Sequence, residues 1–408
     1  MQKGNRRPQP ESKSPPARTT PTCRLPLRTA KIDNMWQKGR FWLRGLGLLL
    51  MLLAMSRRAD AAPSAQIDVY TMGPGDDLFS RFGHAAICVT DELSPQGRCY
   101  NYGTADFSTP GPLTWGVIRG DGQFWVSVVS LPRMMLLYQL EDRTLYRQRL
   151  PLSDAQTAAI VTALHRADRP EQTLYNYRHF DDNCTTRIRD LVDEVTGGAL
   201  RRGNLDKRFA PLRARVYDGF AAAPLLSTLS QLVLGRRVDA PITGWDSMFL
   251  PDVLRAELAS HLLAAPEVVY QRQRSLPPPS NLPPLLFWSL LALGLVCLSR
   301  LGRVGRIATL AVLTLCALVP WSLLVVARLP ELRVNEALLV LWPTDFVFLQ
   351  ARYSPLYARL RLAGLVGVIV GKLLGILVQP LWGLWLLASL PLLSVWQATT
   401  RPRATDIR

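Results

Sequence analysis

The hydrophobic positions divide the chain into a patterned middle and a strongly apolar end. Between Ser64 and about Arg274, short alternating runs predict strands, and apolar residues at helical spacing predict helices. The segment 276–284 is rich in proline and predicts a stiff linker. Residues 285–397 then consist mostly of long apolar stretches. We therefore predict an α+β domain over residues 64–275, followed by an all-α transmembrane bundle.

Within the middle region, five segments have the composition or alternation of strands, and two have the spacing of helices. Ser153 is placed to cap the first helix. Asp182 or Asn183 is placed to cap the second, which Gly197-Gly198 would end. The segment 94–97 predicts the turn between the second and third strands. The predicted strands are 67–72, 84–90, 98–102, 124–130 and 144–150.

The apolar end predicts about five membrane spans, because about twenty apolar residues cross a bilayer. The stretch 337–349 is the weakest of them, since Pro343 and Asp345 interrupt it. The number falls to four if the last stretch is re-entrant. The predicted spans are 285–299, 307–327, 337–349, 362–378 and 381–396.

The net charge of +17 is concentrated beside the apolar segments. Residues 1–63 carry 13 basic and 3 acidic side chains, residues 64–274 carry 23 and 24, and residues 275–408 carry 12 and 4. The middle is therefore nearly neutral, which argues against nucleic acid as a partner. If the middle lies outside, five spans place the arginine clusters inside, as the positive-inside bias requires. This predicts a multi-pass protein of the cell inner membrane, with its main domain in the periplasm and a cytoplasmic tail at 398–408.

The N-terminal region has the pattern of a leader followed by an export signal. Residues 1–34 are rich in Pro, Arg, Ser and Thr. They predict a disordered or non-translated leader, which makes Met35 the expected start. Basic residues, a short apolar core and Ala59-Asp60-Ala61 follow. Residues 35–62 therefore predict a signal peptide or a signal anchor.

The sharpest local motif is Asp181-Asp182-Asn183-Cys184-Thr185-Thr186-Arg187 at a strand-to-helix junction. A thiol at a helix N-terminus meets free N–H groups and the positive end of the helix dipole, and both favour the thiolate. The same N–H groups can hold an oxyanion during acyl transfer. A cysteine nucleophile also needs a base, and His84 is the best candidate because it begins a predicted strand directly after Gly83. The alternative is that Cys184 is a buried hydrophobic residue or half of a disulfide.

The remaining cysteines predict structural roles. Cys88 and Cys99 would face each other across a hairpin, so a disulfide between them is a possibility in an oxidising compartment. Cys297 and Cys316 lie in apolar stretches, where a thiol is usually a small hydrophobe. No Cys or His spacing suggests a zinc site, and no metal or cofactor is expected. Surface or structural positions are expected for the other histidines: His165, His179 and His261.

Four separated motifs follow one another along the middle region: Gly83-His84-Ala85, Tyr100-Asn101-Tyr102-Gly103-Thr104-Ala105-Asp106-Phe107, Asp182-Asn183-Cys184-Thr185-Thr186-Arg187 and Met248-Phe249-Leu250-Pro251. Over roughly residues 66–275 they resemble the bacterial DUF4105 family, the periplasmic domain of the Bacteroides-type lipoprotein N-acyltransferase. The order of the histidine and the Asn-Cys pair also resembles circularly permuted NlpC/P60 and lecithin:retinol acyltransferase-like folds.

This resemblance implies a permuted papain-like core in which Cys184 is the nucleophile and His84 the base. Such folds place a polar residue beside the histidine strand to orient the imidazole. Asn101 and Asp106 are the candidates for that position, with Tyr102 next. The alternative is that the aromatic run at 100–103 only packs the hairpin. Asn183 and Thr185 would support the oxyanion.

Three functions follow as hypotheses. In the first, Cys184 takes an acyl group from a membrane phospholipid or lipoprotein as a thioester and passes it to an amine. In the second, water replaces the amine, which makes the protein a cysteine peptidase, amidase or lipase of the cell envelope. In the third, the protein is a non-catalytic envelope scaffold.

Overall fold

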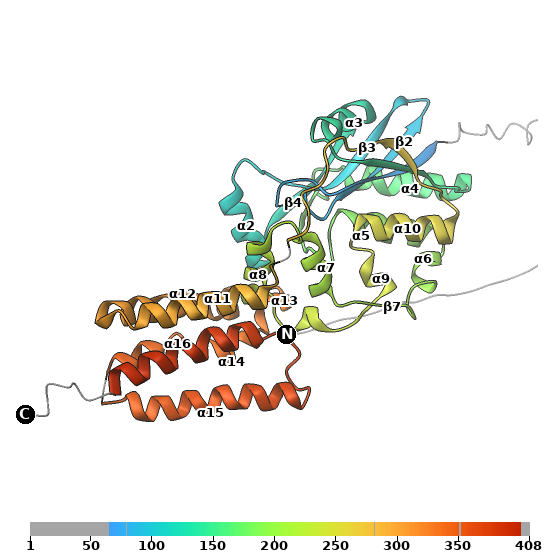
Figure 1. Ribbon diagram of the computed structural model, residues 1–408. Coiled ribbons are helices and arrows are strands. Elements are labelled where there is room, and N and C mark those ends of the chain that lie inside the picture. Colours follow the sequence, from blue (N-terminus) through green and yellow to red (C-terminus); the bar gives the residue numbers. More distant parts are fainter. Residues whose placement is uncertain (1–64, 79, 281, 351, 401–408) are drawn as a thin grey trace, which may run out of the picture. The chain divides into compact units, whose positions relative to one another are not determined.

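The computed structural model of the protein describes residues 65–400, except residues 79, 281 and 351. The predicted leader and export signal, and all but the first residues of the predicted tail, lie outside the described residues. An α/β region and a C-terminal helical region fall within one compact unit (Figure 1).

The α/β region is built on a seven-stranded sheet with the order β6-β4-β3-β2-β1-β5-β9. Every neighbouring pair of strands is antiparallel. Each of the five predicted strands forms, whereas β6 and β9 are too short to show an alternating pattern. A second, two-stranded sheet pairs β7 with β8. The strands are β1 (Gln66–Met72), β2 (His84–Asp91), β3 (Ser94–Thr104), β4 (Gln123–Ser130), β5 (Leu145–Arg149), β6 (Leu174–Asn176), β7 (Arg208–Phe209), β8 (Ile242–Thr243) and β9 (Glu267–Tyr270).

The hairpin of β2 and β3 reverses earlier than the sequence predicts. Asp91 pairs with Ser94, so the chain turns at residues 92 and 93. The predicted turn at 94–97 is wrong, because these residues begin β3. Gly97 takes a left-handed backbone with φ of 76° near a shift in register between the two strands. The turn-like composition of residues 94–97 therefore reflects an irregular strand rather than a turn.

Both faces of the large sheet are covered, which follows from the alternation of its strands. Ile67 and Ile87 point to one face, where three helices pack, and Tyr70 and Cys88 point to the other, which α3 covers. The three helices on the first face are α4 (Asp154–Ala167), α5 (Cys184–Val195) and α10 (Pro251–Leu262); α3 is Leu131–Leu140. Ser153 and Asn183 cap α4 and α5, as the sequence predicts. The other helices here are α2 (Pro110–Arg119), α6 (Ala199–Arg202), α7 (Leu212–Gly219), α8 (Pro224–Val233), η1 (Arg236–Asp239) and α9 (Gly244–Ser247).

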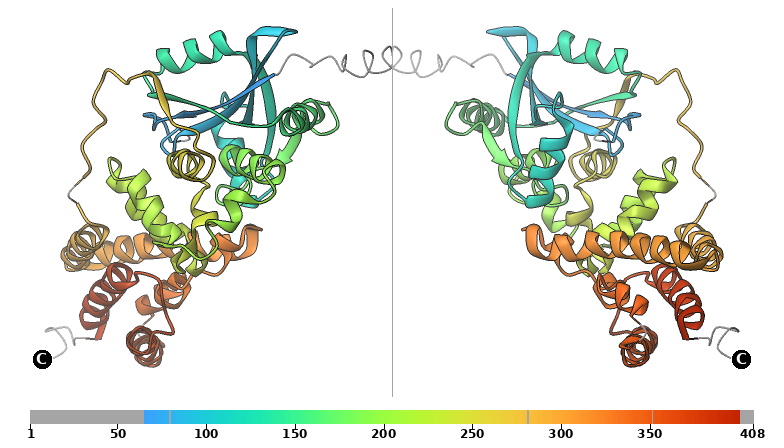
Figure 2. Two further views of the ribbon diagram at one scale, coloured as in Figure 1. Left: turned by 90° about the vertical axis from the view of Figure 1, so that its right-hand side faces the viewer. Right: turned by 90° about the vertical axis from the view of Figure 1, so that its left-hand side faces the viewer.

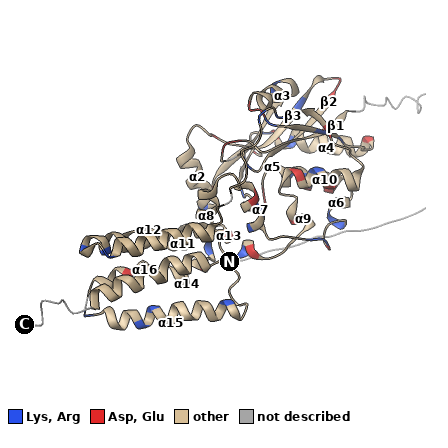
Figure 3. Ribbon diagram, in the orientation of Figure 1, with Lys and Arg blue, Asp and Glu red and all other residues tan. Residues whose placement is uncertain are grey.

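The C-terminal region is helical, and its helices share one apolar core (Figure 2). Among the described residues, α12 is the one helix that is both long and apolar enough to cross a membrane by length and composition. Figure 3 shows how few charges these helices carry. The long helices are α11 (Pro284–Ser299), α12 (Gly302–Val326), α15 (Ser354–Leu373) and α16 (Trp382–Thr400).

The predicted span at 337–349 does not form a continuous helix. It consists of the short helix α14 (Ala337–Val340) and the 3-10 turn η2 (Asp345–Leu349), with Pro343 between them. Proline lacks the N–H that a continuing helix needs. This broken segment packs against α12, α15 and α16. A further short helix, α13 (Pro330–Arg333), precedes it.

Side-chain hydrogen bonds join the helical region to the α/β region. Gln379 Nε2 donates to the carbonyl oxygen of Leu234 at 2.8 Å, and Asn335 Nδ2 donates to that of Leu232 at 2.9 Å. Both amides are almost fully buried. Because a buried polar group is costly to leave unpaired, these bonds favour a fixed contact between the two regions.

Candidate active site

Helix α5 begins at Cys184 because Asn183 caps it. Asn183 Oδ1 accepts hydrogen bonds from the N–H groups of Thr185 at 2.9 Å and Thr186 at 2.8 Å, and Thr186 Oγ1 accepts one from the N–H of Asn183. This reciprocal pattern is a capping box. Asn183 Nδ2 donates to two backbone carbonyls, one of them that of Phe249. Because both ends of its amide are used, Asn183 holds the start of the helix in place.

The Cys184 thiol lies close to the end of the paired part of β2 and β3. Within the described strands, the pairing of β2 with β3 runs from Ile87 and Tyr100 toward the hairpin turn. Gly103, farther along β3, lies beside the cysteine, because a Cβ at Gly103 would be in ordinary van der Waals contact with Cys184 Cβ, at 3.6 Å. Cys184 is 8% exposed. The cysteine is therefore almost fully buried near the end of the paired strands.

Gly83 directs His84 toward the thiol. Gly83 has φ of +80°, and a Cβ there would lie 2.7 Å from the carbonyl oxygen of Met72. A side chain at Gly83 would therefore be strained both by its backbone and by lack of space. His84 follows as the first residue of β2, and it lies close enough to Cys184 to lower the pKa of the thiol.

The surroundings of Cys184 favour its thiolate. Burial raises the pKa of the thiol, but the charge of His84 and hydrogen bonds with His84, the backbone of Ala85 and Thr185 outweigh burial and bring the pKa to about 7. Thr185 Oγ1 lies 3.7 Å from Sγ. A thiol with this pKa is roughly half ionised near neutral pH, which makes it a competent nucleophile.

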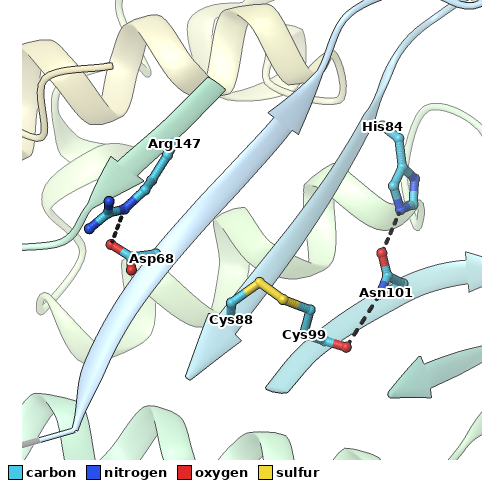
Figure 4. The surroundings of a disulfide bond; sticks show 6 residues. All are labelled: Asp68, His84, Cys88, Cys99, Asn101 and Arg147. Atoms are coloured by element: carbon cyan, nitrogen blue, oxygen red, sulfur yellow. Dashed lines mark hydrogen bonds and ion pairs between the residues drawn. A yellow bond between two sulfur atoms is a disulfide. The ribbon is translucent and has the colours of Figure 1, made fainter. Parts of the chain in front are cut away.

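Asn101 is the polar residue that the structure places beside His84. Its Oδ1 lies 3.4 Å from His84 Nε2, and its Nδ2 donates to the carbonyl oxygen of Cys99 at 3.3 Å (Figure 4). Cys99 forms a disulfide with Cys88 directly across the hairpin. The disulfide thus ties together the two strands that carry Asn101 and His84.

Asp106, the other candidate for orienting the imidazole, bonds within its own loop. Its carboxylate accepts hydrogen bonds from the hydroxyl and the N–H of Ser108, at 2.5 and 3.1 Å. These bonds, with a further one from Thr109, lower the pKa of Asp106. Asp106 therefore shapes the loop after β3.

Tyr175 on β6 belongs to the site but was not predicted from the sequence. Its Oη would lie 3.8 Å from a Cβ on Gly103, the same point that lies 3.6 Å from Cys184 Cβ. The hydroxyl is buried and has no hydrogen-bond acceptor within the described residues. Burial and then the negative charge of Cys184 raise the pKa of Tyr175, so its proton stays in place. Tyr175 thus offers an unused O–H donor close to the thiol.

His179 does not compete with His84 as a base. Its ring packs edge-on against Phe82, Phe180 and Phe249, and its Nδ1 lies 3.3 Å from the hydroxyl of Tyr177. Burial lowers the pKa of His179 to about 4, so the ring is neutral. The expectation of a structural role for His179 agrees with this packing.

A polar pocket of about 440 Å³ opens beside the N-terminal half of α5. The guanidinium of Arg187 lies 3.8 Å from the centre of the Tyr175 ring and pairs with Asp182 at 2.7 Å. The pocket could receive the polar part of a substrate. Among the described residues, no group of three or more His, Cys, Asp or Glu side chains could hold a metal ion. The pocket is lined by Tyr102, Arg178, Asp181, Asp182, Arg187 and Asp190.

The Met248-Phe249-Leu250-Pro251 motif holds the two halves of the site together. The carbonyl oxygen of Phe249 accepts a hydrogen bond from Asn183 Nδ2 at 2.9 Å. Pro251 Cγ lies 3.2 Å from the position of a Cβ on Gly83. One short segment therefore contacts both the cap before Cys184 and the glycine before His84.

Residues 54–216 match the family model described as the Lnb N-terminal periplasmic domain. This range contains His84, Asn101, Tyr175 and Cys184, and it ends before the Met248–Pro251 motif. Searches among curated proteins and among solved structures found no match. The resemblances to the DUF4105 family and to NlpC/P60 folds stay predictions. The family match and the membrane-length helix α12 together indicate a membrane-associated periplasmic protein with an Lnb-type periplasmic domain.

Proposed function

We propose that this protein is a membrane-anchored periplasmic acyltransferase that works through a thioester on Cys184. The observation that carries the proposal is the pairing of Cys184 with His84 at the N-terminus of α5, where the pKa of the thiol is about 7. The Lnb-type domain supports a role in lipoprotein processing. The acyl donor in this proposal is a phospholipid or a lipoprotein, and the acceptor is an amine.

In the first half-reaction the Cys184 thiolate attacks the carbonyl carbon of an acyl ester. A carbon–sulfur bond forms, and the ester carbon–oxygen bond breaks as the tetrahedral intermediate collapses. His84, which took the thiol proton, returns it to the departing alcohol. The products are an acylated Cys184 and a lysolipid.

In the second half-reaction an amine attacks the thioester carbon. A carbon–nitrogen bond forms, the carbon–sulfur bond breaks, and Cys184 leaves as the thiolate. His84 accepts the proton that the amine loses. Asn101, which lies beside Nε2 of His84, keeps the imidazole in position through both steps.

Both half-reactions pass through an oxyanion that needs hydrogen-bond donors. The N–H of Cys184 stands at the first position of α5, where N–H groups have no partner within the helix. The buried hydroxyl of Tyr175 is the second donor in this proposal, since it has no acceptor within the described residues. The positive end of the α5 dipole adds to both.

The C-terminal helices supply the membrane anchor in this proposal. We propose that α11, α12, α15 and α16, with the broken segment containing α14 and η2, lie in the inner membrane as a multi-pass anchor. Their shared apolar core and the length of α12 support this placement. Such an anchor would keep the thiol close to its lipid substrates.

The test is to detect the acylated enzyme. The full-length protein is incubated with phospholipid vesicles and analysed by intact-mass spectrometry, before and after treatment with hydroxylamine, which cleaves thioesters. We expect one acyl chain to be gained and then lost with hydroxylamine. Cys184→Ala should gain none. Cys297→Ser, which removes a free thiol elsewhere in the chain, should behave like the wild type.

The acceptor is then tested by adding an amine-terminated lipopeptide. Transfer of the acyl chain to the lipopeptide supports the acyltransferase. Release of the chain as free fatty acid would instead favour the hydrolase hypothesis. Equal acyl transfer by wild type and Cys184→Ala would contradict any role for the thiol. Absence of transfer by both proteins would favour a scaffold.

A further inference from the structure

Two short helices of the α/β region, α2 and α8, pack against the end of α12. We call this pair the collar. The backbone N–H of Arg328, just beyond α12, donates to the carbonyl oxygen of Arg119 at the end of α2. Gly120 follows and lies so close to Leu329 that a Cβ there would be 3.3 Å from its side chain. The end of α2 is therefore fixed beside the end of α12 (Figure 1).

Helix α8 is fixed at the same level by a different contact. Gln231 of α8 accepts a hydrogen bond from Trp288 Nε1 of α11 at 2.9 Å, and both side chains are buried. Leu232 of α8 belongs to the apolar core of the C-terminal helices. The collar thus meets the helical region through two independent attachments.

The collar carries a single charged residue, at the end of α2. Helix α8 has no charged residue, and α2 has none before Arg119, its last residue (Figure 3). Its large apolar side chains nevertheless stand open to their surroundings: Trp115 is 51% exposed, Leu225 54% and Leu229 39%. Both helices also begin with proline, which suits a helix start.

Basic side chains stand at the edge of this apolar surface. The side chain of Arg119 is 42% exposed and that of Arg328 is 69% exposed. Asp121 lies between them, 2.7 Å from the first guanidinium and 3.9 Å from the second. The group keeps a net positive charge, which suits the phosphates of lipid headgroups. Tryptophan beside arginine is the composition typical of a membrane interface.

The length of α12 indicates how deep in the membrane the collar lies. Its 25 residues span about 37 Å at 1.5 Å per residue. This exceeds the roughly 30 Å of a bilayer's hydrocarbon core. The end of α12 at Val326 therefore emerges among the headgroups, and the collar, attached through Arg328 and Leu329, lies at the same depth.

We infer that the collar is a second membrane-contact surface, with Trp115, Leu225 and Leu229 inserted into the headgroup boundary of a phospholipid bilayer. The inference rests on the proposed membrane placement of α12 but not on the chemistry of Cys184. The exposed face of the collar continues directly from α12, the helix that crosses the bilayer in this proposal. Lipid around the end of α12 would therefore also contact the collar.

The experiment uses full-length protein in nanodiscs that hold a single copy each. Their phospholipid carries a diazirine close to the headgroup. After illumination, lipid-labelled peptides are identified by mass spectrometry in both the wild type and Cys184→Ala, so lipid attached as a thioester is not counted. We expect peptides from α2 and α8 to be labelled several-fold more than those from α3. Helix α3 is the matched control, because Leu136, Leu137 and Leu140 are 50–76% exposed, at least as much on average as the collar residues, but α3 covers the far face of the sheet.

Substitutions then test the individual side chains. Trp115→Glu and Leu225→Glu should each reduce labelling of their own helix several-fold, while Leu136→Glu should change neither. Labelling of α12 in the same samples confirms that each variant is folded and inserted. If α12 is labelled but the collar is labelled no more than α3, the inference is overturned. If α12 itself is not labelled, the membrane placement in the proposed function fails along with it.

Discussion

The two regions of the molecule each contain a buried ionisable pair, and the pairs differ in how far they are closed. In the helical region, Arg361 Nε lies 2.8 Å from Asp345 Oδ1, and the two side chains are 2% and 3% exposed. Tyr357 donates a further hydrogen bond to the same carboxylate at 2.9 Å, and the ring of Trp342 covers the guanidinium. This pair is almost completely closed off from solvent, although Nη1 of Arg361 has no hydrogen-bond partner within the described residues.

The pair in the α/β region is open by comparison. Cys184 is 8% exposed, His84 is partly exposed, and the Tyr175 hydroxyl has no acceptor within the described residues. Free hydrogen-bonding capacity next to a nucleophile suits a site that must accommodate a reacting group. The comparison teaches that burial of charge alone does not identify a site. What distinguishes the two places is their chemistry: Arg361 and Asp345 form a fixed ion pair, whereas Cys184 carries a thiol whose pKa is about 7.

The largest expected effect is on stability, at the closed pair. Arg361→Ala would leave the Asp345 carboxylate buried without its partner, which typically costs about 3–5 kcal/mol. We expect a large drop in the thermal unfolding temperature in detergent. The double variant Arg361→Met with Asp345→Leu should recover most of it. If the double variant stays as unstable as the single one, the pair has a role beyond closing the structure.

The next effect is on activity, at the open pair. Tyr175→Phe removes only the unused hydroxyl, and loss of one oxyanion donor typically costs about 10²–10³ in rate. We expect slower thioester formation with an unchanged unfolding temperature. Tyr70→Phe, at a buried tyrosine on the other face of the sheet, is the control. Equal rates for the wild type and Tyr175→Phe would remove Tyr175 from the mechanism.

Removal of the disulfide between β2 and β3 should have an intermediate effect on both stability and activity. Replacing Cys88 and Cys99 by serine removes a cross-link that closes a short loop, which by chain entropy costs about 2–3 kcal/mol. Because Asn101 donates to the carbonyl oxygen of Cys99, the change should also loosen the contact of Asn101 with His84. We expect a lower unfolding temperature together with a lower kcat. A stability loss with an unchanged kcat would show that the strand register survives without the bond.

The smallest effect concerns pH. The thiolate is the reactive form, so the rate of alkylation of Cys184 should fall as the pH drops through its pKa of about 7. His84→Ala removes the charge that lowers this pKa and leaves burial, which raises it. The midpoint of the rate profile should therefore move upward by about one pH unit or more. An unchanged midpoint would mean that the N-terminus of α5, without His84, lowers the pKa of the Cys184 thiol.

Local patterns predicted the parts of the site that depend on local structure. The cap at Asn183, the start of α5 at Cys184 and the strand that His84 begins follow from residue types and spacing, because each is decided within a few positions. Tyr175 could not be found in this way, since β6 has only three residues and reaches the site through its pairing with β4. The turn of the β2–β3 hairpin was misplaced because a local pattern was present but misleading. Turn-forming residues around Gly97 fit an irregular strand once the register with β2 is known.

The helical region shows the same limit. Hydropathy located the apolar stretches, and α12 agrees closely with the predicted span at 307–327. The stretch 337–349 has a similar composition, yet Pro343 and the contact of Asp345 with Arg361 break it into separate turns. A window of hydrophobicity does not detect a partner sixteen residues away.

The segment from Met248 to Pro251 bears on how small a working version of this domain could be. The family match ends at residue 216, yet Phe249 and Pro251 contact both Asn183 and Gly83. A chain cut at that boundary would keep the thiol and the imidazole but lose the clamp that aligns them. A version of this domain that keeps these contacts therefore extends at least to Pro251, at the start of α10.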